Sequence, residues 1–135
     1  MANSKSNSLG KSERLKSRKQ IDILFDSGKK ITVFPFRMIY TITGGAGSVR
    51  AGFTVSSKNF PRAVDRNRIK RLTREAYRVQ NAALKTLINV NKQQIHLFFI
   101  YTGREILSFN EVKAGLVKVL DKLVRTIHEI NPANT

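Results

Sequence analysis

The residues best suited to chemistry in this sequence lie in one basic stretch, residues 66–78. Six of these thirteen residues are Arg or Lys, and Glu75 is the single acid among them. On a helix of about 3.6 residues per turn, Arg66, Lys70, Arg74 and Arg78 recur along one face. Like charges four residues apart repel one another. The planar fork of Arg suits pairs of phosphate oxygens. The stretch therefore predicts a surface that binds a polyanion rather than an ordinary solvated helix face.

The composition of the whole chain indicates the same kind of partner. The 135 residues include 25 Lys plus Arg against 9 Asp plus Glu, a net charge of +16. Such an excess is typical of proteins that bind nucleic acid or an anionic surface. The chain has no cysteine, which excludes disulfides, thiolate metal sites and a cysteine nucleophile. We see no apolar run of roughly 20 residues and no signal peptide, so we expect a cytoplasmic protein without a membrane partner.

No catalytic constellation is visible in the sequence. His96 falls in an expected strand and His128 at the end of an expected helix, so they do not form a pair. The carboxylates are scattered, and no Asp/Glu cluster suits two-metal hydrolysis. The Gly-rich segment at 44–47 lacks the Lys and the following helix of a phosphate loop. We therefore expect a binding module with no catalytic residue and no metal site of its own.

Hydrophobic periodicity predicts the elements that must position the basic stretch. Residues 1–10 and 131–135 are expected to be tails, and residues 11–130 a single α+β domain. The order α-β-β-α-β-α predicts a two-layer sandwich of helices on a mixed sheet. The expected helices cover residues 11–27, about 61–89 and 109 onward, and the expected strands cover 31–43, 49–56 and 95–101.

Each expected helix carries an apolar stripe. The basic helix should bury positions spaced three and four apart, namely Ile69, Leu72, Ala76, Val79, Ala83 and Leu87. The last helix should begin at Ser108, with Glu111 completing a capping box. Its core-facing side should contain Val112, Leu116, Val119, Leu123 and Ile127.

Two features of the other elements leave alternatives open. Basic residues crowd the start of the first helix, either as a frayed, solvated end or as a second basic contact: Lys11, Arg14, Lys16, Arg18 and Lys19. Small residues at 50–56 leave room on one sheet face, for a ligand or for a packed helix.

The stretch Val64–Arg78 resembles the signature of the bacterial ribonuclease P protein subunit family. Its hallmark is matched by Arg66-Asn67-Arg68 followed by Lys70, Arg71 and Arg74, after a strand that ends Thr-Val-Ser-Ser-Lys. The resemblance covers residues 11–127. It implies a left-handed β-α-β crossover. The general rule would predict a right-handed one.

The resemblance also implies a function. Proteins of this family bind a catalytic RNA that, with Mg²⁺, removes the 5′ leader of precursor tRNA. The implied RNA-binding residues are Arg66, Asn67, Arg68, Lys70, Arg71 and Arg74, and the charged row adds Arg78. The implied groove for the single-stranded leader, between the first helix and the sheet, contains Phe25, Arg37, Tyr40 and Lys58.

Three positions depart from the family pattern. Ile21 replaces an aromatic residue, Ser57 replaces a Lys, and Thr102-Gly103 replace basic residues, with Arg104 as a candidate substitute.

Other classes of protein also fit the charge of the chain. They are a ribosome-associated protein or RNA chaperone without a role in cleavage, a DNA-binding helix module and a membrane-surface helix.

Overall fold

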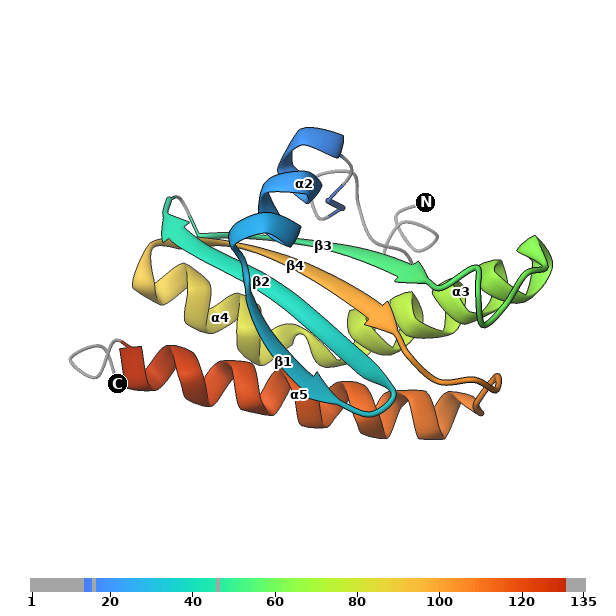
Figure 1. Ribbon diagram of the computed structural model, residues 1–135. Coiled ribbons are helices and arrows are strands. Elements are labelled where there is room, and N and C mark those ends of the chain that lie inside the picture. The colour runs from blue at the N-terminus through green and yellow to red at the C-terminus, as the bar shows by residue number, and fades with distance from the viewer. Residues whose placement is uncertain (1–13, 16, 46, 131–135) are drawn as a thin grey trace, which may run out of the picture.

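A four-stranded mixed sheet with helices on both faces forms the body of the molecule (Figure 1). The structure is a computed structural model and describes residues 14–15, 17–45 and 47–130. The strands are β1 (Lys29–Val33), β2 (Phe36–Gly44), β3 (Ser48–Val55) and β4 (Gln93–Tyr101). The helices are α2 (Arg18–Ser27), α3 (Ala63–Gln80), α4 (Ala82–Asn91) and α5 (Phe109–Ile130).

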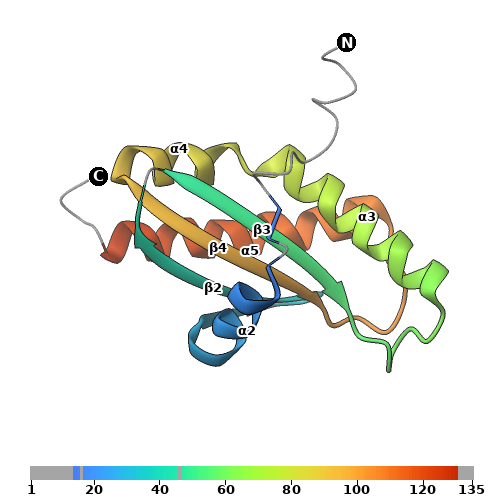
Figure 2. The same cartoon turned by 90° about the horizontal axis from the view of Figure 1, so that it is seen from above.

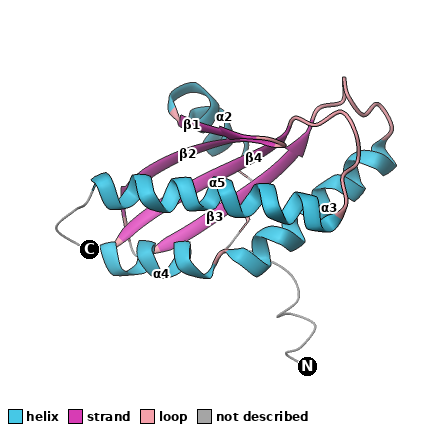
Figure 3. Ribbon diagram, turned by 90° about the horizontal axis from the view of Figure 1, so that it is seen from below, coloured by secondary structure: helices cyan, strands magenta, loops and turns pink. Residues whose placement is uncertain are grey.

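The strands lie in the order β1-β2-β4-β3. β2 is antiparallel to both β1 and β4, whereas β3 runs parallel to β4. Helices α3 and α4 connect these two parallel strands. With the strands pointing upward and the helices in front, β4 lies to the left of β3 (Figure 3). The crossover is therefore left-handed, and the expected α+β class with a mixed sheet is confirmed.

Helices α3, α4 and α5 cover one face of the sheet and bury the main core. Side chains from alternate strand positions meet there. The ring centroids of Phe53, Tyr77 and Phe99 lie 5.5–5.7 Å from one another. The five α5 residues expected to face the core are all buried. Ser108 and Glu111 form the expected capping box, in which the Glu111 N–H donates to Ser108 Oγ and the Ser108 N–H donates to Glu111 Oε1.

Among the described residues, the opposite face carries α2 and a small second core of Leu15, Leu24, Ile39 and Phe98. The prediction of a helix from residue 11 was wrong at residues 14, 15 and 17, while residues 11–13 and the two expected tails lie outside the described residues. The Leu15 N–H donates to the Ala51 carbonyl at 2.9 Å, and α2 begins only after its N-cap, Ser17. The face of β3 that carries Gly52 is thus covered by protein, because a Cβ at Gly52 would meet the Phe98 ring.

Two elements expected to be continuous are divided. The expected strand 31–43 is a hairpin of β1 and β2, which reverses at Phe34-Pro35 with a cis peptide bond and pairs Val33 with Phe36. The expected helix 61–89 is interrupted at Asn81, which is buried and has φ −89° and ψ 0°. If β1 and β2 are counted as one strand and α3 and α4 as one helix, the element order is the predicted α-β-β-α-β-α.

The apolar stripe of α3 also differs from the prediction. Its buried residues are Ile69, Thr73, Ala76 and Tyr77, whereas Val79 is 46% exposed. Thr73 is tolerated inside because its hydroxyl donates to the Ile69 carbonyl at 2.9 Å. The buried face is therefore turned toward Tyr77, which packs against Phe53 of β3.

Candidate nucleic-acid interface

Helix α3 extends along and beyond the outer edge of β3, which leaves much of its surface in solvent (Figure 2). At about 100° per residue, Asn67, Arg71, Arg74 and Arg78 lie on the side away from Ile69 and Ala76. Asn67 and Arg71 are exposed, and Arg74 is half-buried. The fold therefore presents a cationic face whose direction is fixed by the buried face opposite.

Arg66 has a different environment from the rest of the basic row. Its Nη1 donates to the carbonyl oxygens of Phe60 at 2.9 Å and Pro61 at 2.8 Å. The Phe60 ring is buried in the main core beside Tyr101. Arg66 thus holds the loop before α3 against the helix, and one of its donor groups is occupied by the protein itself.

The start of α3 is stabilised electrostatically rather than by a side-chain cap. Arg62 occupies the N-cap position and makes no capping bond, while Asp65 lies in the first turn. A carboxylate at this place interacts favourably with the helix dipole. The Arg62 Nε lies 3.4 Å from the Asp65 carboxylate, so part of the acid's charge is also compensated.

The remaining hallmark cations occupy two flanks of α3. Arg68 and Arg71 line a shallow pocket of about 340 Å³ with Leu72, Glu75 and Phe109, toward the start of α5. Lys70 and Arg74 are half-buried and lie on the flank of Tyr77, toward β3. The structure therefore spreads the charge around the helix instead of aligning it in a single row.

Arg78 is engaged by the acid of the stretch. Its Nε donates to Glu75 Oε1 at 3.2 Å, and Nη2 donates to the other carboxylate oxygen. The hydrogen bond from Arg78 holds the pKa of Glu75 below its usual range. At neutral pH this pair is ionised, and Arg78 contributes less uncompensated charge than Arg71 or Arg74.

An apolar surface lies beside α2 on the other face of the sheet, where the family resemblance implies the leader groove. The Phe25 ring is 45% exposed and packs edge-on against Phe98, with 5.3 Å between ring centroids. Ile21 and Ile100 continue this surface. Arg37 pairs with Ile100 in the sheet register and is exposed. The surface thus joins an aromatic platform to a cation at one end.

Lys58 lies beyond the end of β3, at the same end of the sheet as Arg37. Thr54 near that strand end pairs with Ile100, which marks the end of the groove. Lys58 is exposed, and its backbone N–H donates to Ser56 Oγ at 3.2 Å. Two cations therefore lie near the apolar surface, from different elements.

Tyr40 is not part of this groove. Its side chain is 4% exposed and belongs to the main core on the α5 side, whereas Ile39 faces α2. Burial raises the pKa of its hydroxyl. Adjacent strand residues point to opposite faces, so placing Tyr40 with Phe25 was wrong by one residue. Phe98 was missed because its strand reads as apolar throughout, although Gly52 opposite it signalled a large ring.

No catalytic arrangement emerges from the described residues. His96 lies on the α2 face of β4, and His128 lies in the last turn of α5. In residues 14–15, 17–45 and 47–130 there is no group of three metal-ligating side chains. None of the helices in these ranges has the length and apolar character that crossing a bilayer requires.

A cationic helix together with an exposed aromatic and apolar surface on a sheet is typical of the class of proteins that bind RNA. The model of the ribonuclease P family matches residues 9–124 of the chain. A ribonuclease P protein component from Porphyromonas gingivalis is 33% identical over 121 residues and covers 88% of each chain. One from Chlorobium phaeobacteroides is 39% identical over 99 residues, which are 67% of this chain and 68% of the relative.

Solved structures agree with this at the level of the fold. The ribonuclease P protein from Thermotoga maritima superposes with a TM-score of 0.64 at 24% identity, covering 82% of this chain and 96% of that one. The protein from Staphylococcus aureus gives 0.61 at 21% identity, covering 84% and 96%. The chain belongs to the ribonuclease P protein component family. It is thereby a subunit of the ribonuclease P holoenzyme in tRNA 5′ processing, with the ribonuclease P RNA as its partner.

Proposed function

We propose that α3 is the contact surface for the ribonuclease P RNA and that the α2 groove holds the single-stranded 5′ leader of precursor tRNA. The observation that carries the first part is the charged surface of α3. Outside its buried face, the helix carries four exposed or half-buried cations, Arg68, Lys70, Arg71 and Arg74. Such a surface binds phosphates of a folded RNA without depending on the base sequence.

The second part depends on the chemistry of the groove. Single strands bind to proteins through bases stacked on aromatic rings and through a cationic track for the backbone. Phe25 offers an exposed ring face, and Phe98 fixes the orientation of that ring from below. Arg37 and Lys58 supply the cations. Tyr40 has no role in this proposal.

We assign the hydrolysis itself, and the Mg²⁺ that it needs, to the RNA partner in the cytoplasm. Within the described ranges, no three His, Asp or Glu side chains come together to hold a metal ion. The buried Tyr101 has its hydroxyl engaged by the Glu105 carbonyl and the Leu107 N–H. Burial raises the pKa of this hydroxyl, which makes it a structural donor.

Reconstitution with the ribonuclease P RNA tests the proposal. At low Mg²⁺, where the RNA alone cleaves slowly, the added chain should restore removal of the leader. Phe25→Ala should weaken binding of precursor tRNA by about fivefold to a hundredfold, the value of one stacked base, and leave mature tRNA unaffected. Phe34→Ala is the matched control, because Phe34 is 67% exposed in the β1–β2 turn.

Two outcomes would contradict the proposal. If Phe25→Ala weakened the binding of precursor and mature tRNA equally, the assignment of the leader to the groove would be refuted. Absence of any stimulation by the chain, with RNA binding intact, would favour an RNA chaperone without a role in cleavage.

A further inference from the structure

Helix α2 has a second flank, on the side away from Phe25. At about 100° per residue, Gln20, Ile23 and Ser27 lie together on this flank, across the buried Leu24 from Phe25. They line a pocket of about 280 Å³ with four residues of the sheet, Thr41 and Thr43 of β2 and Gln94 and His96 of β4. We call this space the polar pocket.

The lining of the polar pocket is rich in hydrogen-bonding groups but has no fixed charge. Three hydroxyls, two amides and one imidazole surround it, and Ile23, which is 53% exposed, adds an apolar wall. Phosphate groups are usually met by Arg and Lys, whereas base edges are read by neutral donors and acceptors. The lining therefore favours the polar edge of a flat ring over a phosphate.

His96 is held in a defined state within this lining. Gln94 Nε2 lies 2.9 Å from His96 Nε2. The amide nitrogen can only donate, so His96 Nε2 accepts and the ring proton is on Nδ1. Burial, and then the charge of Arg50, lower the pKa of His96. The imidazole is neutral near pH 7, and because Nε2 is occupied by Gln94, the Nδ1–H is the donor that it can present to a ligand.

Arg50 of β3 supplies a cation beside the pocket. It pairs with His96 in the parallel register of β3 and β4. Its Nε is buried and has no hydrogen-bond partner within the described residues. A guanidinium in this position can attract the phosphate of a nucleotide whose base enters the pocket.

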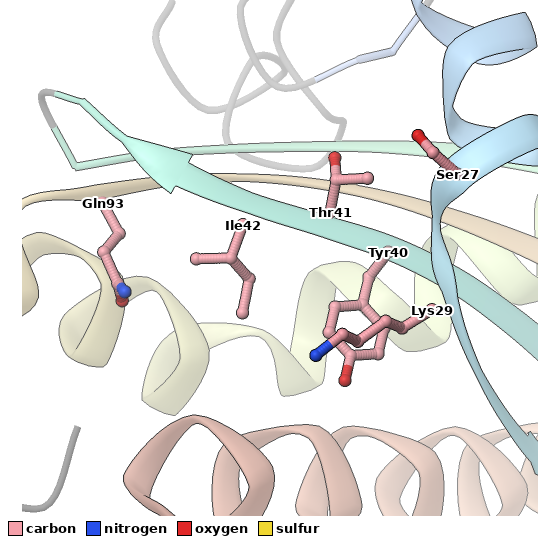
Figure 4. Close-up of a pocket in the computed structure, with 6 residues that line it drawn as sticks. All are labelled: Ser27, Lys29, Tyr40, Thr41, Ile42 and Gln93. Atoms are coloured by element: carbon pink, nitrogen blue, oxygen red, sulfur yellow. The ribbon is translucent and has the colours of Figure 1, made fainter. Parts of the chain in front are cut away.

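The edge of β2 beside the polar pocket is not covered by β1. β1 begins at Lys29 opposite Tyr40, so β2 beyond Tyr40 has no β1 residue beside it. A second pocket of about 350 Å³ occupies this edge and shares Ser27 and Thr41 with the first. Figure 4 shows Thr41 pointing toward α2 while Lys29 and Tyr40 point toward α5.

Two acids, Asp22 and Asp26, are exposed on the outer surface of α2 between the flanks. Asp22 is paired with Arg18, whose Nε lies 3.7 Å from its carboxylate, so Asp26 is the acid that repels phosphates more directly. We therefore expect a strand in the Phe25 groove and a base in the polar pocket to come from separate RNA segments.

We propose that the polar pocket binds one unpaired RNA base, whose edge is hydrogen-bonded by Gln94 and the hydroxyls of Thr41 and Thr43. The inference rests on the proposed function only in taking RNA as the ligand. The volume lies just below the roughly 300–1,000 Å³ of pockets for drug-sized ligands, which suits one base and not a stacked pair. The base can come from the tRNA leader or from a loop of the ribonuclease P RNA.

The test compares a double variant, Thr41→Val with Gln94→Met, against Thr86→Val. Thr86 is exposed on α4, which packs on the opposite face of the sheet, so it is the matched control. The probes are single-stranded RNA hexamers of A, C or U, measured by fluorescence anisotropy with the full chain. We expect wild type to prefer one base. The double variant should bind that hexamer about fivefold to a hundredfold more weakly, the worth of two hydrogen bonds, and lose the preference.

The result that would overturn the inference is an unchanged base preference in the double variant. If the variant does not fold, NMR of the wild-type chain decides instead. The Gln94 side-chain amide and the His96 ring signals should shift on addition of the preferred hexamer, and absence of shifts would overturn the inference.

Two further arms identify the source of the base. Weakened binding of precursor but not of mature tRNA assigns it to the leader, and weakened binding of the ribonuclease P RNA alone assigns it to that RNA. Either result supports the site. Failure of the chain to stimulate cleavage would refute the proposed function without touching the hexamer result.

Discussion

The substitution Arg66→Ala separates a structural cation from the RNA-binding cations beside it. Arg66 Nη1 donates to the Phe60 and Pro61 carbonyls, and the loop that it holds carries the buried Phe60 ring. Arg68, two residues on, is exposed. The same change at the two positions should therefore affect different properties of the protein.

The expected magnitude follows from the two contacts of Arg66. A hydrogen bond from a charged donor contributes about 1.5–3 kcal/mol, and less where water competes. The bond to Phe60 is partly buried, whereas that to Pro61 is exposed. Counting mainly the first, Arg66→Ala should lower the free energy of unfolding by about 1–2.5 kcal/mol. In a chain of this size that is a Tm lower by about 3–10 °C.

Urea unfolding followed by circular dichroism measures the effect. The midpoint should fall for Arg66→Ala with an unchanged m value, and Arg68→Ala should stay within about 0.5 kcal/mol of wild type. Arg68→Ala should instead weaken binding to the ribonuclease P RNA. Equal stability of the two variants would refute the role assigned to Arg66, and unfolding by Arg68→Ala would refute the exposed role of Arg68.

Three further predictions concern the charged stretch, the second core and pH. Glu75→Gln removes the acid paired with Arg78, so RNA binding should tighten and its salt dependence should steepen by up to about one contact; a flatter dependence would contradict this. Gly52→Ala places a Cβ 2.6 Å from the Phe98 ring, and calorimetry should find a loss of about 1–3 kcal/mol; a stability equal to wild type would mean that the face is not packed. The pKa of His96 is lowered in the fold, so the unfolded chain binds its proton more readily. Stability should decline as pH falls below about 6.5, and His96→Gln should flatten this part of the pH profile; an unaltered profile would contradict burial of the ring.

Much of the fold follows from periodicity in the sequence. The last helix combines a capping box with a regular apolar stripe, and both signals appear in the structure as predicted. The strands 49–56 and 95–101 are also found, within two residues at their ends. In these elements local propensity and burial favour the same conformation, which makes them predictable.

The errors arose where tertiary packing decided between local alternatives. Residues 31–43 have continuous β-propensity, and only pairing of Val33 with Phe36 reveals a hairpin. Asn81 is buried at the junction of α3 and α4 with φ −89° and ψ 0°, an interruption that the apolar periodicity of the sequence does not encode. The start of the first expected helix pairs with β3 through Leu15, a contact between residues distant in sequence.

The candidate site was predictable in its residue types and less so in its geometry. The basic stretch identified the helix and its partner. The tie of Arg66 to two carbonyls and the pairing of Arg78 with Glu75 depend on side-chain positions that spacing alone cannot give. Tyr40 was assigned to the groove by the family resemblance, but it lies on the apolar face of β2 with Phe36 and Met38, which packs in the main core.

The central claim is that four cations of α3, Arg68, Lys70, Arg71 and Arg74, bind phosphates of the ribonuclease P RNA. The most direct measurement is the affinity of the chain for that RNA against salt concentration, for wild type and for the triple variant Lys70→Ala, Arg71→Ala, Arg74→Ala. At about 0.7–0.9 per lost contact, the slope of log affinity against log salt should become shallower by about 2–3. A folded triple variant with the wild-type slope would contradict the claim.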